Sequence, residues 1–511
     1  MSLAAEATYS SPSGVPSLPT GVEILGWAQA RHAYQALEDW LMSASAQQLP
    51  LHEIEREQER RGREIQRRLL EAHLAQRGSG DVGDAIEVGS LEAERPPLLP
   101  SHRRMDPRHP QTIFGEITVD RMGYLHPGEE TVHPLDGQVQ LPHRSFSYEV
   151  QRRVVKAAIQ GPFEEALERL EESTGVAMPK RCAEAILVEA AVDFEAFYQQ
   201  RTPPAPAPTG AILVGSVDGK GIPIKKETPV PRVVQPSKGH KRKQKKMSVV
   251  ATVYSQAPRI RTPEEVIERL FSTEPRSTTT KEPRSRPEYK RVWASLDKGK
   301  AGVLEEVAQE MARRDPSGTQ EWVALTDGER ALQKQVQARL KGVPLVLDFQ
   351  HALSKLWKAA YAFHKEGTPQ AEAWVKQRAL RLLQGDVSQV VKGLRQSATK
   401  RTLKGAKKKV VETTAAYFYR NRIRMRYDEY LRHGWPIATG VVEGACKNLV
   451  KDRMERSGMR WKPEMAEAML KMRATYLSDD FEEYWTFHIQ KEHERLHPPD
   501  HWRPVHPVKE K

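Results

Sequence analysis

Two aspartates occupy matching positions in the sequence, each at the end of an apolar run and each followed by a glycine. Asp218 follows residues 211–217, and Asp327 follows the run 322–325 after one threonine. An aspartate at the carboxyl end of a strand projects from the edge of an α/β sheet, where such sheets place their ligands. The glycine after it removes side-chain bulk and lets a substrate backbone approach. The alternative interpretation is structural, because Asp-Gly is also a common turn.

A glutamate in the C-terminal part of the chain is the third candidate. Glu443 lies in the segment TGVVEGACKNLVKDRM (439–454) between two glycines. Val442, Ala445 and Leu449 recur at helical spacing, which predicts a buried helix face with Glu443 beside it. The alternative interpretation is a solvated residue, because glutamates are mostly exposed.

Two strand aspartates and one helical glutamate together make a ligand set for hard divalent cations. Mg²⁺ binds proteins through a few carboxylates plus substrate phosphate. Phosphodiester cleavage and transfer use two such ions about 4 Å apart, one activating the nucleophile and one stabilising the leaving oxygen. We therefore predict that Asp218, Asp327 and Glu443 bind two Mg²⁺ or Mn²⁺ ions and carry catalysis.

Basic residues are concentrated in three stretches of a chain whose formal net charge is +13. Residues 238–246 contain six Lys or Arg and no acid, and residues 392–409 contain eight and again no acid. Four arginines between positions 420 and 426 follow three consecutive aromatic residues (417–419). Lys and Arg neutralise phosphates and release the counterions condensed on nucleic acid. A single run is usually a solvated face, but three runs around the acidic residues favour a DNA path.

The segment 162–186 has the pattern of a helix-turn-helix unit. A first amphipathic helix ends at a break (173–175), and a second helix begins after Pro179. In this motif the second helix enters the major groove of DNA, and its early residues contact bases. An ordinary helical hairpin is the alternative interpretation. The residues predicted to contact DNA here and in the basic stretches are Lys180, Arg181, Lys241, Arg242, Lys243, Lys245, Lys407, Lys408 and Arg422.

Two further residue pairs could assist the chemistry. Asp348 and His351 follow the apolar run 345–347 and could supply an extra ligand or orient substrate. The alternative is a helix cap at Asp348 and a packed His351. Arg460 and Trp461 are predicted to clamp a phosphate and to stack on an unpaired base. The alternative for the tryptophan is a place in the core.

The elements that must position these groups indicate a multidomain α/β chain. Apolar runs at 211–217, 247–254, 322–325 and 345–347 predict strands, and helical patterns lie between and after them, which predicts a mixed sheet. The proline-rich string at 202–209 marks the clearest domain boundary. The predicted divisions are a disordered start (1–21), a helical region with a linker (22–100), a small β unit (101–145), a helix-turn-helix-like region (146–201), a catalytic core (210–350 and 436–480), a helical basic insertion (351–435) and a C-terminal tail (481–511).

Four ordered strings carry a resemblance to a known family: SVDGKGIP (216–223), LTDGERAL (325–332), VLDFQHALSKLWKAA (346–360) and GVVEGACKNLVKDRMERSGMRW (440–461). They resemble bacterial insertion-sequence transposases of the ISKra group, a DDE class whose catalytic core is RNase H-like. The resemblance covers roughly residues 110–475. It implies that Asp218, Asp327 and Glu443 are the metal-binding triad and that the basic helical segment 351–431 is an insertion.

The chain departs from that family at one place. In many members of that family, a small cysteine-rich zinc-binding unit follows the strand that corresponds to GEITVDR. This chain has Tyr124, His126 and His133 there, and its cysteines are Cys182 and Cys446, far away in the sequence. A four-cysteine zinc site is excluded, and two histidines without partners are usually surface residues. We therefore predict no structural zinc.

These observations lead us to expect the DNA transposase of an insertion sequence. It would bind terminal inverted repeats, cleave DNA at the element ends and join the 3′-hydroxyls to target DNA, as a homo-oligomer in the active complex. The alternatives are a catalytically inactive, domesticated DNA-binding protein and a structure-specific nuclease with the same core. No apolar run approaches the ~20 residues that span a bilayer, and the first residues lack the features of a signal peptide. We expect a cytoplasmic bacterial protein, associated with the nucleoid when bound to DNA.

Overall fold

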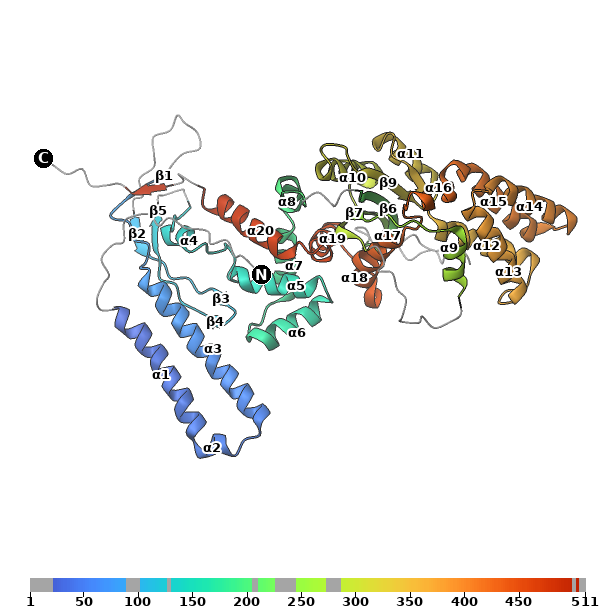
Figure 1. The fold of residues 1–511 in the computed structure, drawn as a ribbon. Coiled ribbons are helices and arrows are strands. Elements are labelled where there is room, and N and C mark those ends of the chain that lie inside the picture. The colour runs from blue at the N-terminus through green and yellow to red at the C-terminus, as the bar shows by residue number, and fades with distance from the viewer. Residues whose placement is uncertain are drawn as a thin grey trace, which may run out of the picture. The chain divides into compact units, whose positions relative to one another are not determined.

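The computed structural model describes residues 22–88, 102–125, 130–204, 210–225, 245–272, 286–498 and 502–504. The chain has a mixed α/β fold, as predicted, and divides into two compact units (Figure 1). The first contains 1–158, 163–183 and 488–511, and the second contains 159–162 and 184–487. The predicted disordered start, His126, Lys241, Arg242 and Lys243 lie outside the described residues. Within the described part of the chain, no helix is both long enough and apolar enough to cross a bilayer.

The first unit begins with a helical hairpin. Helix α1 (Val22–Met42) packs against α3 (Leu51–Gln76), and the short α2 (Ala44–Gln47) lies between them. The Glu/Arg pattern of α3 produces ion pairs one turn apart, which stabilise an exposed helix by about 0.2–0.5 kcal/mol each. Ion pairs within α3 do not join it to α1, so the packing of the two helices against each other must stabilise the hairpin. Both helices match the sequence prediction.

Short antiparallel strand pairs follow this hairpin in the first unit. One pattern differs from expectation, because residues predicted to continue the β alternation form helix α4 (Pro134–Gln138). Proline is favoured in the first turn of a helix, where its missing N–H costs nothing. The strand pairs are β1 (Ile86–Val88) with β11 (Trp502–Pro504), β2 (His102–Met105) with β5 (Met122–Leu125), and β3 (Gln111–Thr112) with β4 (Gly115–Glu116).

The segment predicted as helix-turn-helix does form two helices separated by a break. Helix α5 (Tyr148–Ala158) precedes α6 (Phe163–Thr174), and α7 (Lys180–Ala190) begins after the break. Gly175 turns the chain with a φ of 72°, a conformation that suits glycine. The second helix begins after Pro179 as predicted, whereas the first continues to Thr174, into the predicted break at 173–175. The role of the two helices in DNA binding remains a prediction.

The second unit is built on one five-stranded sheet with the strand order β10-β9-β6-β7-β8. Strand β6 pairs antiparallel with β7, which pairs antiparallel with β8, whereas β6, β9 and β10 run parallel to one another. The bounds are Ile212–Pro223 for β6, Lys245–Gln256 for β7, Glu288–Ser295 for β8, Glu321–Thr326 for β9 and Leu345–Leu347 for β10. Four of these strands were predicted. Strand β8 was not, because its first three residues are polar and exposed, so no apolar run marks its start.

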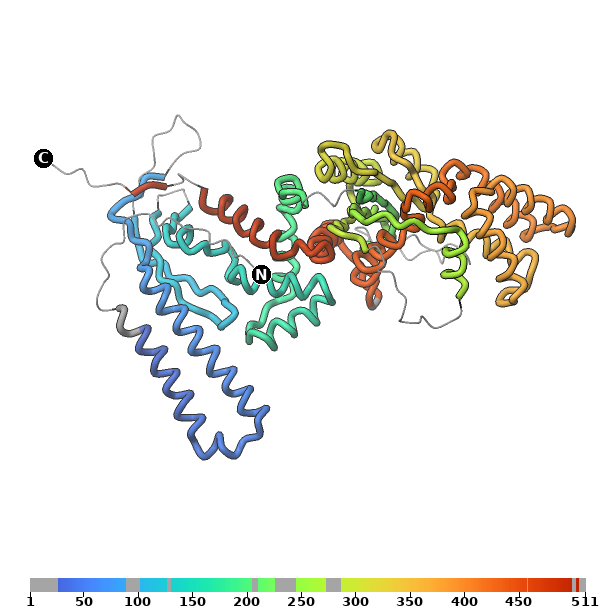
Figure 2. Tube along the Cα trace, viewed as in Figure 1, coloured from blue at the N-terminus to red at the C-terminus, as the bar shows by residue number. Residues whose placement is uncertain are grey.

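Helices connect and cover these strands. Helix α10 (Gly299–Arg314) leads from β8 to β9 and packs on β6 and β7, and α11 (Arg330–Arg339) leads from β9 to β10. Gly215 of β6 lies directly under α10, since a Cβ there would be 2.8 Å from the sulfur of Met311. Helix α19 (Pro463–Leu477) packs on β8. Figure 2 follows the chain through this unit.

A block of helices follows β10 and shares one hydrophobic core with the sheet. That core joins Val323 and Val346 of the strands to Leu356, Leu382 and Phe418 of the helices. The segment predicted as a helical insertion is helical throughout, and its last helices pack beside β10 (Figure 1). The bounds are Phe349–Phe363 for α12, Pro369–Leu383 for α13, Val387–Lys400 for α14, Gly405–Asn421 for α15, Arg422–Arg424 for the 3-10 helix η1 and Tyr427–Arg432 for α16. A short helix not predicted from sequence, α9 (Pro263–Phe271), starts with a capping box at Thr262 and packs on α13.

The segment expected to be a C-terminal tail instead contains a helix and the strand β11. Helix α20 (Phe481–Leu496) begins with residues whose aromatic side chains are buried, among them Tyr484 and Trp485. This apolar spacing is what favours a packed helix there.

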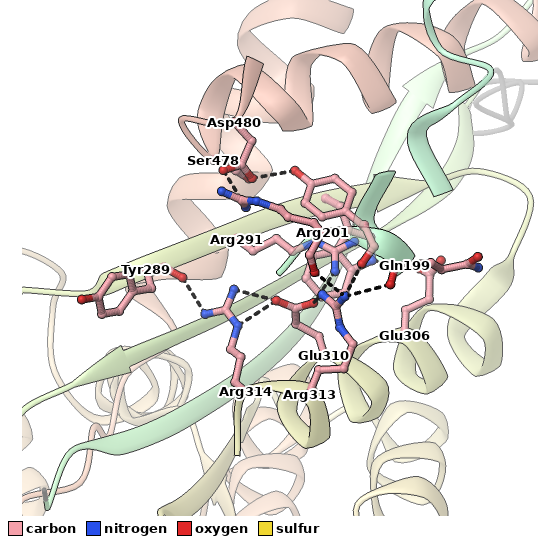
Figure 3. Close-up of polar contacts among 12 residues, drawn as sticks. Gln199, Arg201, Tyr289, Arg291, Glu306, Glu310, Arg313, Arg314, Ser478 and Asp480 are labelled. Carbon is pink, nitrogen blue, oxygen red and sulfur yellow. Dashed lines mark hydrogen bonds and ion pairs between the residues drawn. The ribbon is translucent and has the colours of Figure 1, made fainter. Parts of the chain in front are cut away.

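A buried polar cluster joins β8, α10 and the chain that leads into β6 (Figure 3). The Glu310 carboxylate accepts hydrogen bonds from Arg291 at 2.6 Å, from Arg313 at 2.7 Å and from Arg314 at 2.7 Å. Arg291 also lies 3.6 Å from the ring centroid of Tyr198 in α8 (Phe194–Gln200). One carboxylate therefore holds three guanidinium groups in a region where a lone charge is costly.

Candidate active site

The two predicted aspartates lie at the same level on neighbouring parallel strands. Ser216 of β6 is paired with Leu325 of β9, so Asp218 and Asp327 each lie two residues beyond a matched pair. Neighbouring strands are about 4.8 Å apart, and the even offset directs both side chains to one face of the sheet. The register thus places Asp218, within β6, and Asp327, one residue beyond the end of β9, at neighbouring backbone positions.

One detail of the prediction for Asp218 is wrong. It does not end its strand, because β6 continues to Pro223 and remains paired with β7. The edge is created by β9, which ends at Thr326 and leaves β6 without a parallel neighbour beyond that level. Asp218 is half-buried, and its Oδ1 accepts the N–H of Gly219 at 2.6 Å.

Gly328 and Tyr417 hold the backbone around Asp327. The Tyr417 hydroxyl donates to the carbonyl oxygen of Asp327 at 2.9 Å, and Asp327 Oδ1 accepts the N–H of Glu329 at 2.9 Å. Gly328 has a φ of 93°, and a Cβ there would be 2.5 Å from the Tyr417 hydroxyl and 2.9 Å from Leu347. The glycine is required because helix α15 lies directly against this turn.

Replacing Gly328 by alanine should therefore disturb the turn that carries Asp327. We expect a loss of about 2–3 kcal/mol in unfolding free energy, from the left-handed backbone and the overpacking together. Gly342→Ala is the matched control, because Gly342 has a φ of 78° but nothing within 4 Å of its Cβ position. The control should lose only about 1 kcal/mol. Urea denaturation measures both values, and equal losses in the two variants would contradict the packing argument.

Glu443 lies in helix α17 (Gly440–Ala445), which packs on β6 and β7. Its side chain is 46% exposed, and its Oε1 accepts the Thr439 hydroxyl at 3.2 Å. Val442 and Ala445 are buried, as the helical spacing predicted. The alternative interpretation, a solvated residue, also fits in part, because the Glu443 side chain is exposed while its neighbours Val442 and Ala445 are buried.

Helix α17 continues directly into the π-helix η2 (Cys446–Lys451). One-turn π-helices are rare and occur frequently at functional sites. Here the segment starts at Cys446, whose thiol donates to Asp218 Oδ2 at 3.4 Å. Burial, together with the charges of Asp218 and Glu443, raises the pKa of the Cys446 thiol. This buried thiol therefore ties the helix that carries Glu443 to the strand that carries Asp218.

Asp348 and His351 form a second polar group beside the triad. Asp348 caps α12, its Oδ1 accepting the N–H groups of Gln350 and Thr439 at 3.1 and 3.2 Å. Its Oδ2 accepts the N–H and ring Nδ1–H of His351 at 3.1 and 2.5 Å. Burial opposes ionisation of Asp348, but these hydrogen bonds outweigh it and hold its pKa below the usual value. The predicted helix cap at Asp348 is thus present, whereas His351 is 40% exposed and not packed.

The hydrogen bond to Asp348 raises the pKa of His351, and the charges of Asp327 and Glu443 raise it further. His351 Nδ1 is 3.8 Å from Glu443 Oε1. The imidazole therefore lies beside the helical carboxylate of the predicted triad. Asp348, His351 and Glu443 form a group with ligand atoms within 4.8 Å of one another, and oxygen and nitrogen ligands of this kind suit a divalent cation.

Three residues of this site were not predicted from the sequence. Thr439, Tyr417 and Cys446 act by holding Glu443, Asp327 and Asp218 respectively. Cys446 and Thr439 lie within four residues of Glu443, so the helical spacing around that glutamate could have indicated them. Tyr417 contacts Asp327 across 90 positions, and no local pattern indicates such a contact.

Trp461 does not have the predicted role in stacking on an unpaired base. Its side chain is 6% exposed, its Nε1 donates to the carbonyl oxygen of Met454 at 2.9 Å, and Arg453 covers its ring. The backbone of Trp461 also bridges to Ile224 just after β6. Trp461 is a core residue, as the alternative held, whereas Arg460 is exposed.

The described basic residues predicted to contact DNA differ in whether their side chains form ion pairs with nearby carboxylates. Lys407, Arg422 and Arg181 are exposed, and Arg422 covers the ring of Tyr419, which is itself 50% exposed. Other predicted contacts are engaged in ion pairs with nearby carboxylates: Lys180 with Glu164 at 2.5 Å, Lys245 with Glu455 at 2.6 Å, and Lys408 with Glu412 at 3.8 Å.

Comparison with protein-family models finds no family that matches this chain. Comparison with curated proteins finds no match either.

Proposed function

We propose that this protein is a DNA transposase of an insertion sequence, with a metal-dependent catalytic centre formed by Asp218, Asp327 and Glu443. The observation that carries the proposal is the register of β6 and β9, which aligns the two aspartates, together with the packing of α17 on β6. Cys446, three residues after Glu443, contacts Asp218, and Asp327 follows the end of the strand beside Asp218. These links between three separate segments support the proposed triad.

The arrangement of the second unit supports an RNase H-like core. Three consecutive strands, β6, β7 and β8, are antiparallel, and β9 and β10 extend the sheet in parallel on the β6 side. Helix α10 connects the two parts, and the helical insertion separates β10 from α17. This is the order that the resemblance to DDE transposases leads one to expect.

Asp218, Asp327 and Glu443 would hold two Mg²⁺ or Mn²⁺ ions, which acidify the attacking hydroxyl and stabilise the leaving oxygen when bound. The chain's own part is to fix the ligands. Cys446 orients the Asp218 carboxylate, the Tyr417 hydroxyl fixes the turn of Asp327, and Thr439 orients Glu443. Their hydrogen bonds reduce the freedom of ligands that are otherwise partly exposed, so less entropy is lost when the substrate binds.

DNA is the proposed partner, and the exposed basic residues of α15 and η1 are its proposed path beside the site. We expect binding to weaken about 10³-fold or more between 50 and 200 mM salt. Arg422→Gln should lower the slope of log affinity against log salt by about one. Arg432→Gln is the matched control, because that exposed arginine is already paired with Asp428 at 2.9 Å. Fluorescence anisotropy on duplex DNA measures both slopes, and an equal change in the two variants would count against this path.

The experiment that tests the function uses labelled DNA from the element ends, Mg²⁺ and a plasmid target. Products joined to the plasmid would support the transposase proposal. Cleavage without joining would indicate the nuclease alternative, and binding alone would indicate an inactive, domesticated DNA-binding protein. The proposal places this reaction in the bacterial cytoplasm, with the protein acting as a homo-oligomer that pairs two DNA ends.

A further inference from the structure

The closest grouping of potential metal ligands in the described part of the chain is Asp348, His351 and Glu443. One ligand atom from each lies within 4.8 Å of the other two. Asp218 and Asp327 do not belong to this group, although the strand register brings them to the same edge. The hydrogen bonds of the three side chains show that they cannot all bind a cation in the same way.

Asp348 has no free position for a cation. Its side chain is fully buried, and its two oxygens accept four hydrogen bonds, from Gln350, Thr439 and two N–H groups of His351. A carboxylate has about four lone-pair sites in all. Its hydrogen-bonding capacity is therefore already used, and it acts on the cation only through His351.

His351 has one ring nitrogen engaged and one available. Nδ1–H donates to Asp348, so the tautomer that remains after loss of a proton has its lone pair on Nε2. No described residue forms a hydrogen bond with Nε2, and the side chain is 40% exposed. In metal sites the ligating histidine almost always donates its other N–H to a carboxylate or carbonyl, which fixes the ring and raises its basicity. Asp348 and His351 have this arrangement.

We propose that His351, whose ring lies beside Glu443 with Nδ1 3.8 Å from Oε1, is a ligand through its other nitrogen, Nε2, of the cation bound by Glu443, and that Asp348 is the positioning residue behind it. Asp327 acts on His351 through its charge, although it does not belong to the close group of ligand atoms. The inference deepens the proposed function, on which it rests, because it assigns a nitrogen ligand to a site so far described with oxygen ligands.

A nitrogen ligand changes which metal the site prefers. Mg²⁺ favours oxygen donors, whereas imidazole suits transition metals, and Mn²⁺ accepts both carboxylate and imidazole. We therefore expect Mn²⁺ to bind more tightly than Mg²⁺, and the difference to depend on His351.

Pulsed EPR of Mn²⁺ bound to the full-length protein tests this directly. The echo modulation of the wild-type complex should contain a ¹⁴N coupling from a directly bound imidazole. In His351→Gln that coupling should disappear, while Mn²⁺ still binds about tenfold more weakly through the carboxylates. Affinity for Mg²⁺ should change less than affinity for Mn²⁺ in the same variant, as measured by calorimetry.

Two further variants separate ligation from structural effects. His433→Gln is the matched control, because His433 is an exposed histidine 3.9 Å from a glutamate, Glu321, in the same unit. It should keep the ¹⁴N coupling and the Mn²⁺ affinity. Asp348→Asn should keep the coupling but weaken Mn²⁺ binding, and circular dichroism would verify that each variant is folded.

A Mn²⁺ signal without ¹⁴N coupling in the wild type would overturn the inference, as would the same coupling in His351→Gln. These outcomes would leave the proposed function intact if joined DNA products still form with Mg²⁺. If DNA joining fails while the ¹⁴N coupling is normal, the transposase proposal is rejected, whereas the assignment of His351 as a metal ligand stands.

Discussion

Replacing Asp327 by alanine should lower the rate of DNA cleavage by at least about 10³-fold, because each 1.36 kcal/mol of lost transition-state stabilisation costs a factor of ten. Asp327 lies beyond the end of β9, so its side chain supports no strand pairing. Its side chain accepts a hydrogen bond from the N–H of Glu329. We therefore expect the variant to fold normally and to bind DNA within about twofold of the wild type.

The same loss is expected for Asp218→Ala and Glu443→Ala, measured as initial rates on labelled end DNA with Mg²⁺. Asp386→Ala serves as the control, because Asp386 is an exposed aspartate at the start of α14, in the helical insertion. If any one triad variant kept the wild-type rate, that residue would not be a ligand of the catalytic ions. A parallel loss of DNA affinity would instead indicate a binding role.

Replacing Glu310 by glutamine should destabilise the protein by about 3–5 kcal/mol, the range for removing one partner of a buried ion pair. Three guanidinium groups converge on its carboxylate, and two of them belong to side chains that are less than 10% exposed (Figure 3). Without that carboxylate their charges are left close together and uncompensated. Glu305→Gln on the same helix is the control, because Glu305 is 55% exposed, and it should change stability by less than about 0.5 kcal/mol.

The contribution of Glu310 also predicts a pH dependence. Burial opposes its charge, but its arginine partners outweigh burial and lower its pKa from 4.5 to about 2. A group whose pKa is lower in the folded state stabilises the protein above its unfolded pKa, and this stability is lost as pH falls. Urea denaturation should show the difference between wild type and Glu310→Gln shrinking as pH falls below 4.5. A difference that stayed constant down to pH 3 would contradict the ion-pair account.

The sequence predicted most of the strands of the second unit because their apolar runs are short, bounded and buried. The runs that end before Asp218 and Asp327 correspond to β6 and β9, and the spacing around Glu443 correctly predicted a helix with a buried face. These patterns are local, so they can be recognised in a single sequence. Strand β8, at the edge of the sheet, was not predicted because its first three residues are exposed and interrupt the apolar pattern.

The sequence could not predict what depends on register and long-range packing. Asp218 was expected at the end of a strand, but the edge is formed by its neighbour, which stops earlier. The residue type of Trp461 suggested a nucleic-acid contact. Its Nε1–H instead donates a hydrogen bond to a carbonyl oxygen within the core. Whether a tryptophan faces solvent or packs depends on tertiary contacts that neighbouring residues do not specify.

The proposed function requires Asp218, Asp327 and Glu443 to bind cations together at one edge of the sheet. An anomalous difference map from crystals of the protein soaked in Mn²⁺ tests it most directly. The account predicts anomalous density in contact with carboxylate oxygens of all three residues. Mn²⁺ bound elsewhere, with these three carboxylates uncoordinated, would contradict it.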